Sequence, residues 1–233
     1  MKNNSRRACE KAVVLLSGGL DSATTLYYAR DKGFSCTCLS FDYGQRHRRE
    51  LTAAKRIASA AGCGHHTVKI SLPWKGSSLL DKNIRLPLFD RRQSKGSEVP
   101  NTYVPARNII FLSFALSCAE AVGAGVIFIG ANAVDYSGYP DCRPEFYKAF
   151  RNVVRTGTRS GKDRPVRVMT PLIDLTKAGI VKLGSRLKVP FELTWSCYAG
   201  GSHLCGRCDS CFYRRKGFLE AGIADPVAYG SKK

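Results

Sequence analysis

Residues 12–33, AVVLLSGGLDSATTLYYARDKG, decide the fold of this 233-residue chain. The run 12–17 is short, continuous and apolar, as expected of a central strand that is buried on both faces. The segment 22–33 reads as a helix that ends at Gly33, and two glycines before it let the backbone turn tightly. A strand that enters a helix through such a turn predicts the first unit of an α/β fold.

Strand-like and helix-like segments alternate along the rest of the chain, which is the pattern of a parallel sheet with crossover helices. We expect further strands at 34–44, 66–72, 126–135 and 167–172, and helices at 47–62, 108–123, 144–154, 176–188 and 209–221. The helix at 108–123 is nearly all apolar, so we expect it to be buried. The predicted fold is α/β, a doubly wound, mostly parallel, Rossmann-like sheet of five strands.

The chain also divides into a large first part and a short tail that carries four clustered cysteines. We expect residues 1–189 to form the α/β domain and residues 190–233 to form a small helical, metal-binding segment. Residues 73–104 show no clear period and contain a basic run. Because structureless stretches of that length usually have a function, we expect a lid or an interface loop there.

The formal net charge of +19 predicts anionic partners such as nucleotides, phosphates, a carboxylate or nucleic acid. A basic solvated surface explains the same charge. Basic and aromatic residues do not interleave on any one face that the sequence reveals, so a nucleic-acid partner is not expected.

The sequence also bears on where the protein works. No apolar run approaches the roughly 20 residues that a membrane-spanning helix needs, so no membrane association is expected. The N-terminal charges are followed by a short apolar run and then by glycines and an acidic residue, without a cleavage site. We interpret this run as a buried first strand rather than a signal peptide, and expect a cytoplasmic protein.

The turn at 17–22, SGGLDS, has the composition of an anion-binding loop. Free N–H groups at the start of the following helix and the helix dipole favour an anion, and Ser17 and Ser22 add hydroxyl donors. Asp21 beside a phosphate implies a bridging cation, which predicts Mg²⁺. The loop lacks the lysine of a Walker motif and differs from GxGxxG. A plain tight turn would explain the glycines, but not the serines and the aspartate together.

Four cysteines in the tail have the spacing of a metal site. Cys197, Cys205, Cys208 and Cys211 fall within fifteen residues, and two-residue spacers let neighbouring thiolates reach one tetrahedral Zn²⁺. Four thiolates leave no open coordination position, so we expect one structural zinc. An iron–sulfur cluster is the main alternative. The arginines at 207, 214 and 215 would offset the negative charge of the site.

Polar side chains follow the expected strands at the ends where ligands bind in open α/β sheets. The candidates for gripping a planar, carboxylate-bearing ligand are Tyr43, Gln45, Arg107, Asp135, Tyr139, Asp141 and Arg143. Polar-loop and helix-cap roles remain open for several of them. Cys142 has no nearby histidine in the sequence and is interpreted as a packing residue.

The loop SGGLDS resembles the SGGxDS signature of the PP-loop ATP pyrophosphatases, an adenine nucleotide alpha hydrolase-like group that transfers AMP to an oxygen of its substrate. The resemblance implies ATP contacts along the whole run Leu16, Ser17, Gly18, Gly19, Leu20, Asp21, Ser22, Ala23, Thr24, Thr25 and Leu26. Together with SFDYGQRH, YVPARN, GANAVDYSGYPDCRPEF and the cysteine tail, it extends in order over residues 12–221. This ordered set closely resembles the 7-cyano-7-deazaguanine synthases of the queuosine pathway.

That resemblance implies a ligase that converts 7-carboxy-7-deazaguanine and ammonia to the nitrile, consuming two ATP. A homodimer is the implied assembly, because family members are dimers or larger. Two other functions stay open: a PP-loop enzyme that adenylates tRNA, and a relative that attaches the deazaguanine to a protein. No acid–base pair is evident, so catalysis is expected to rest on positioning and charge stabilisation, and no catalytic residue is assigned.

Overall fold

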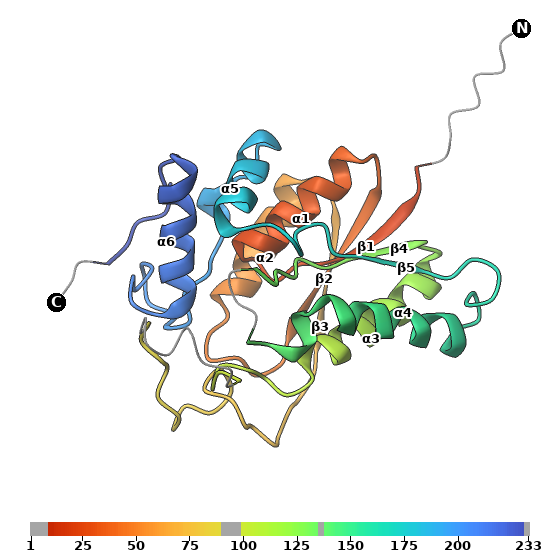
Figure 1. Cartoon of the computed structure of the whole chain (residues 1–233), viewed down its shortest axis with the longest axis horizontal. Coiled ribbons are helices and arrows are strands. Elements are labelled where there is room, and N and C mark those ends of the chain that lie inside the picture. Colours follow the sequence, from red (N-terminus) through yellow and green to blue (C-terminus); the bar gives the residue numbers. More distant parts are fainter. Residues whose placement is uncertain (1–8, 90–98, 135–137, 231–233) are drawn as a thin grey trace, which may run out of the picture.

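The computed structural model describes residues 9–89, 99–134 and 138–230 (Figure 1). Five parallel strands form one sheet in the order β3-β2-β1-β4-β5. The strands are β1 (Lys11–Leu15), β2 (Ser35–Asp42), β3 (Gly64–Lys69), β4 (Val126–Phe128) and β5 (Arg167–Met169). Val13 of β1 pairs with Thr37 on one side and with Ile127 on the other. The strand order reverses between β1 and β4, and such a switch point is where doubly wound folds bind ligands.

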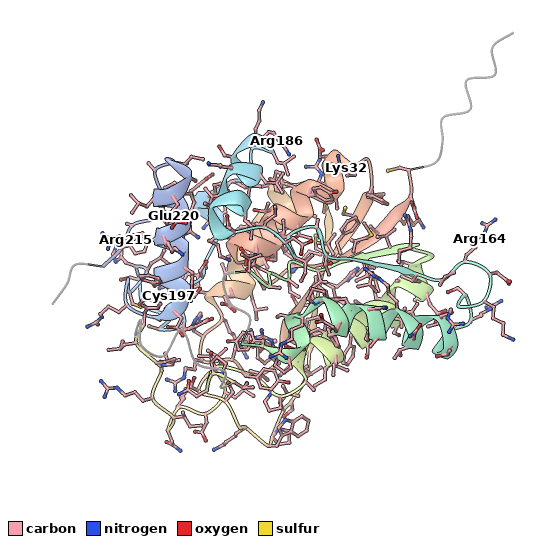
Figure 2. All side chains as sticks on the ribbon, viewed as in Figure 1. Lys32, Arg164, Arg186, Cys197, Arg215 and Glu220 are labelled. Carbon is pink, nitrogen blue, oxygen red and sulfur yellow. The ribbon has the colours of Figure 1, made fainter. Side chains whose placement is uncertain are left out.

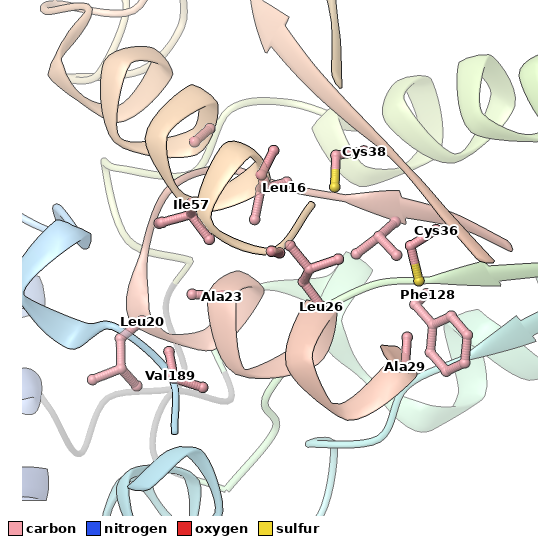
Figure 3. Close-up of a cluster of buried hydrophobic side chains, with 14 of the residues drawn as sticks. Leu16, Leu20, Ala23, Leu26, Ala29, Cys36, Cys38, Ile57, Phe128 and Val189 are labelled. Atoms are coloured by element: carbon pink, nitrogen blue, oxygen red, sulfur yellow. The ribbon is translucent and has the colours of Figure 1, made fainter. Parts of the chain in front are cut away.

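Helices cover both faces of this sheet, as the sequence predicts (Figure 1). One face carries α1 (Leu20–Asp31), α2 (Arg49–Ala60) and α5 (Lys177–Arg186), and the other carries α3 (Arg107–Val122) and α4 (Pro144–Gly157). The apolar run of β1 explains the two layers, because alternate side chains point to opposite faces. Val14 packs with α1 and α2, whereas Val13 packs with α3 and α4. Figure 3 shows the first of these clusters, which includes Leu26, Ile57 and Phe128.

The apolar helix α3 is only half buried, so the prediction that it lies wholly in the core is wrong for one face. Leu112, Ala115 and Ala119 pack beneath the sheet. Ile109 and Phe114 point outward and are 44% and 41% exposed. The sequence could not show this, because a helix that is apolar all round gives no sign of which face is covered.

The strand at 126–135 is also shorter than expected. β4 ends at Phe128, and an irregular polar segment follows it. Two short 3₁₀ helices, η2 (Pro140–Cys142) and η3 (Phe191–Leu193), were not anticipated. Both begin at or just after a proline, and segments of this length have no period to detect.

The last helix, α6 (Asp209–Ala221), packs against α5. Phe218 of α6 joins the same core cluster as α1 and α5. The described part of 73–104 reaches the tail as well, since Phe89 stacks on Phe212 with ring centroids 3.4 Å apart. Figure 2 shows Cys197 beside α6 and Arg164 at the opposite end of the molecule. Within the described residues, no helix has the length and apolar character needed to cross a membrane.

Candidate functional site

A cavity of about 340 Å³ opens at the carboxyl ends of β1 and β4, at the switch point of the sheet. Its wall combines the turn after β1, the loop after β2, the starts of α3 and α5, and the segment before the cysteine cluster. Charged and aromatic members of this wall include Asp21, Tyr43, Arg46, His47, Glu50, Arg107, Tyr139, Lys177, Trp195 and Tyr213. Segments from the whole length of the chain therefore converge on one cavity.

The first glycine of the loop, Gly18, is held in a conformation that other residues rarely adopt. Its φ is +87°, and a Cβ there would overlap the carbonyl oxygen of Glu50 and lie 2.8 Å from the nitrogen of Ala54. The turn thus sits directly on α2. Gly130, just past β4, is also closely packed, because a Cβ there would lie 3.0 Å from the nitrogen of Ser22. Both contacts bring backbone against backbone and fix the shape of the loop.

Two serines bind the loop internally. The Ser17 and Ser22 hydroxyls are 3.0 Å apart, and the Gly19 amide donates to Ser17 Oγ at 3.3 Å. Gly19 is the N-cap of α1 and provides no capping side chain. The helix thus begins at the cavity with only a glycine at its cap, which is the arrangement that suits an anion.

The four cysteine sulfurs form a compact cluster, all within 4.8 Å of one another. Tetrahedral bonds of 2.3 Å to zinc would place sulfurs about 3.8 Å apart, and the Cys205 and Cys211 sulfurs are 3.8 Å apart. The amides of Ala199 and Cys205 donate to Cys197 Sγ at 3.4 and 3.3 Å. Such N–H donors stabilise thiolates, so the donor set fits a four-coordinate metal.

The loop and the cysteine cluster are also joined to each other. The Trp195 amide, two residues before Cys197, donates to the carbonyl oxygen of Gly18 at 2.9 Å. Arg49 at the start of α2 lies over the Trp195 ring at 4.9 Å and donates to the Gly200 carbonyl at 3.0 Å. The glycine loop at 17–22 is therefore in direct contact with the segment that carries the cysteines.

The family model described as "Queuosine biosynthesis protein QueC" matches residues 11–222 of the chain. The chain belongs to this family. The match contains both the glycine loop and the four cysteines, so the two sites described above are parts of one QueC-type domain arrangement.

Curated relatives of this QueC-family chain extend over almost its full length. The 7-cyano-7-deazaguanine synthase of Thermosynechococcus vestitus is 53% identical, covering 94% of this chain and 96% of the relative. The 7-cyano-7-deazaguanine synthase of a Nostoc species is 52% identical, covering 96% and 99%. Among solved structures, NMN synthetase from Francisella tularensis shares the fold, with a TM-score of 0.50 and 18% identity, covering 93% of this chain and 79% of that one.

Residues 16–26, for which the resemblance implies ATP contacts, only partly line the cavity of this QueC-family chain. Leu16, Ser17, Gly19, Leu20, Asp21 and Ser22 line it. Gly18 faces α2, and Ala23 and Leu26 belong to the core. The hydroxyls of Thr24 and Thr25 donate to backbone carbonyls within α1. A helix can present only its first turn to a ligand at its N-terminus, which explains this division.

Three of the expected substrate residues meet on one wall. Arg107 Nη1 donates to the Tyr43 hydroxyl at 3.4 Å, and the Tyr139 hydroxyl is 2.7 Å from that of Thr102. Burial raises the pKa of Tyr43, although Arg107 opposes this effect. Gln45 also lines the cavity, but its amide binds the backbone of Tyr43 and Phe41 and shapes the loop.

The structure uses the remaining candidates differently. Asp141 is buried, and its carboxylate accepts a hydrogen bond from the backbone N–H of Asn108 at 3.0 Å. Asp141 therefore caps the start of α3 instead of facing the cavity. Arg143 is exposed and is not among the residues that line the cavity. Asp135 lies outside the described residues. Cys142 is expected to be a packing residue, but it lines the cavity, where burial raises the pKa of its thiol to about 11.

Lys177 and Glu50 are charged residues of the cavity that the sequence analysis missed. Lys177 Nζ lies 2.9 and 2.7 Å from the two carboxylate oxygens of Asp21, at the start of α5. Glu50 lies in the first turn of α2, and burial raises its pKa to about 7. Both belong to amphipathic helices, where a lone charge looks like surface. Arg46 donates to carbonyls of Ser78, Asp81 and Ile84. Arg214 acts differently from expectation, because it binds Asp225 rather than offsetting the cysteines.

Proposed function

We propose that this chain is an ATP-dependent ligase that converts 7-carboxy-7-deazaguanine and ammonia to 7-cyano-7-deazaguanine through two adenylations. Family membership and the names of the curated relatives support the activity. The observation that carries the mechanism is that one cavity contains the phosphate-type loop, Lys177 and Arg107 together. A single site can then bind both the triphosphate and an anionic acceptor.

The loop end of the cavity fits the triphosphate of ATP. The N–H groups at the start of α1 and the Ser17 hydroxyl would donate hydrogen bonds to the phosphates. The Lys177 ammonium group, which donates to Asp21, would then donate to a phosphate oxygen instead. Asp21 is the carboxylate beside the loop, so it would hold the Mg²⁺ that accompanies ATP. The bound cation would supply further positive charge to the phosphates.

The opposite wall fits the deazaguanine. Tyr43 and Tyr139 offer aromatic surfaces, and the Arg107 guanidinium between them suits a carboxylate. The assignments of Asp135, Asp141 and Arg143 to the substrate remain proposals of the sequence alone. Arg107 would place the carboxylate oxygen in line with the α-phosphorus and hold its charge until the bond forms.

Adenylation solves a chemical problem that positioning alone cannot. A carboxylate is a poor electrophile because oxide would have to leave, whereas its adenylate releases AMP. Ammonia then gives the amide, and adenylation of the amide oxygen gives the nitrile as AMP leaves. Lys177 and the start of α1 would stabilise the charge that develops on the phosphates in both rounds.

The cysteine cluster would hold one structural zinc, because four sulfurs complete its coordination. In this view residues 190–233 are a zinc-binding segment docked on an ATP-binding domain of residues 1–189. The link from Trp195 to Gly18 makes the segment a support for the phosphate loop. No role in the chemical steps is assigned to the metal.

The protein would act in the cytoplasm as a homodimer on small molecules, without a nucleic-acid partner. The exposed Ile109 and Phe114 on α3 provide an apolar surface for a second copy, whereas Phe89, in the described part of residues 73–104, stacks on Phe212 of the tail. Light scattering of the wild type and of Phe114→Glu would test the assembly, since the variant should be a monomer.

The function is tested by incubating the pure protein with 7-carboxy-7-deazaguanine, ATP, Mg²⁺ and ammonium, followed by mass spectrometry. The expected products are the free nitrile, AMP and pyrophosphate. Dependence on added tRNA would favour a tRNA-adenylating enzyme, and a mass shift on a protein would favour conjugation. Release of ADP and phosphate without AMP would contradict the proposal.

A further inference from the structure

Glu50 places a carboxyl group in the cavity, and the steps proposed above assign it no role. It lies in the first turn of α2 and lines the cavity. Its backbone oxygen touches Gly18 of the phosphate loop, so α2 holds it next to the nucleotide end. Glu50 shares this cavity with Arg107 and Tyr43 of the substrate wall.

The proposed reaction releases protons from nitrogen, and something must accept them. Capture of ammonium on the first adenylate yields the amide, and conversion of the second adenylate to the nitrile removes both remaining N–H protons. Asp21 is bound to Lys177, and the Cys142 thiol has its pKa raised by burial to about 11. Asp209 lies next to the cysteine ligand Cys208.

We propose that the Glu50 carboxylate is the catalytic proton acceptor for both nitrogen-transfer stages, an inference that rests on the proposed function. In the first stage it takes a proton from ammonium, and the nitrogen lone pair forms the C–N bond. The C–O bond to AMP then breaks, and AMP leaves with the electron pair. After passing the first proton to water, Glu50 takes a second proton from the new nitrogen, which leaves the neutral amide.

The second stage follows the same balance. After adenylation of the amide oxygen, Glu50 removes one N–H proton to give the neutral imidate. Removal of the other N–H proton places its electron pair in the third C–N bond, and the C–O bond to AMP breaks with its pair on AMP. Glu50 gives each proton to water at the open side of the cavity before the next transfer.

The surroundings of Glu50 suit this task. Burial raises the pKa of Glu50 to about 7, the range in which a carboxyl group both accepts and releases protons efficiently near neutral pH. Arg107 on α3 opposes the rise and keeps the charged form accessible, while Cys197 from the tail adds to it. Tyr43 and His47 from the loop before α2, together with Tyr139, Cys142 and Tyr198, are further titratable groups that line the cavity.

A surface role for Glu50 as a favourable charge at a helix start is the competing explanation. Glu145 provides a matched control, because it is an exposed glutamate in the first turn of α4. Three variants are therefore compared with the wild type: Glu50→Gln, Glu50→Asp and Glu145→Gln. Metal content and thermal unfolding show that each is folded.

The experiment measures adenylation and nitrogen transfer separately. Carboxylate-dependent exchange of labelled pyrophosphate into ATP reports adenylation, and mass spectrometry reports amide and nitrile. We expect Glu50→Gln to keep exchange within about threefold while nitrile formation falls about 100-fold or more, the usual range for loss of a general base. Its remaining rate should rise with pH as free ammonia accumulates, Glu50→Asp should recover part of the loss, and Glu145→Gln should match the wild type.

Each other outcome overturns the inference. If Glu50→Gln makes the nitrile at the wild-type rate, the carboxylate accepts no proton that matters. If exchange and nitrile formation fall by the same factor, Glu50 serves nucleotide binding or the loop instead. A wild-type protein that catalyses neither exchange nor nitrile formation would instead contradict the proposed function, and the two failures are thus distinguishable.

Discussion

Lys177 and Asp21 are 156 residues apart in the sequence, yet the lysine Nζ lies 2.7 and 2.9 Å from the two carboxylate oxygens. The pair connects the start of α5 to the start of α1 at the cavity. It is partly buried, with the two side chains 15% and 29% exposed, and it therefore keeps a cation beside the phosphate loop.

We expect Lys177→Gln to lower kcat/KM for adenylation about 100-fold or more, because a preorganised charge would be lost where phosphate charge develops. Pyrophosphate exchange measures this step. Lys182→Gln, on an exposed position of the same helix, is the control and should leave exchange unchanged. Equal rates for both variants would show that Lys177 does not contact ATP.

Gly18 allows a test that separates backbone strain from close packing. Gly18 and Gly33 have φ of +87° and +83°, but a Cβ at Gly33 would meet nothing within 4 Å. Both Ala variants should lose about 1–2 kcal/mol from the left-handed backbone. Gly18→Ala should lose a further 1–3 kcal/mol or so because it overlaps α2. Urea unfolding measures both, and similar losses would contradict the tight contact.

Loss of one cysteine sulfur should release the proposed zinc and loosen the tail. For Cys211→Ser we expect less than one equivalent of metal by mass spectrometry and rapid proteolysis after residue 190, because binding and folding of such segments are coupled. Cys118→Ser, a half-buried cysteine of α3, should keep its metal. Full metal content in Cys211→Ser would argue against the four-sulfur site.

The pair of Arg214 and Asp225 predicts a pH-dependent stability. Burial alone would raise the pKa of Asp225, but hydrogen bonds from Arg214 and Tyr229 outweigh it and lower the pKa below 3.8. Its contribution is therefore complete above pH 3.8 and is lost as the pH falls through the folded-state value.

Because Arg214 and Asp225 are 2% and 9% exposed, Asp225→Asn should cost about 3–5 kcal/mol at pH 7 by leaving a buried charge without its partner. The difference from wild type should shrink below pH 3.8. Denaturant unfolding at several pH values measures it, with the exposed Asp31→Asn as control. A deficit that does not change with pH would contradict the ion pair.

The fold and the placement of the glycine turn and of the cysteine cluster could be predicted because their signals are local. The apolar run of β1, the turn at 17–22 and the spacing of the cysteines each lie within one short stretch, and the structure places them as expected. The family model matches residues 11–222, in agreement with the resemblance found from the sequence over residues 12–221.

The contacts across the cavity could not be predicted, because they join segments far apart in the chain. Lys177 and Glu50 look like surface charges of amphipathic helices until the fold brings them to the loop. Asp141 looks like a ligand residue until α3 uses it as a cap. Arg214 likewise looks like a partner of the cysteines, but it forms an ion pair with Asp225, eleven residues later.

The hydrogen bond from the Trp195 amide to the Gly18 carbonyl has a consequence for cells that are short of metal. Without metal on the cysteines, the segment before Cys197 would no longer be held in place, and the hydrogen bond from Trp195 to Gly18 would be weakened. Every side chain that contacts ATP would still be present. Metal starvation would then appear in kinetics as weakened nucleotide affinity, and resupply of zinc alone would restore it without new protein synthesis.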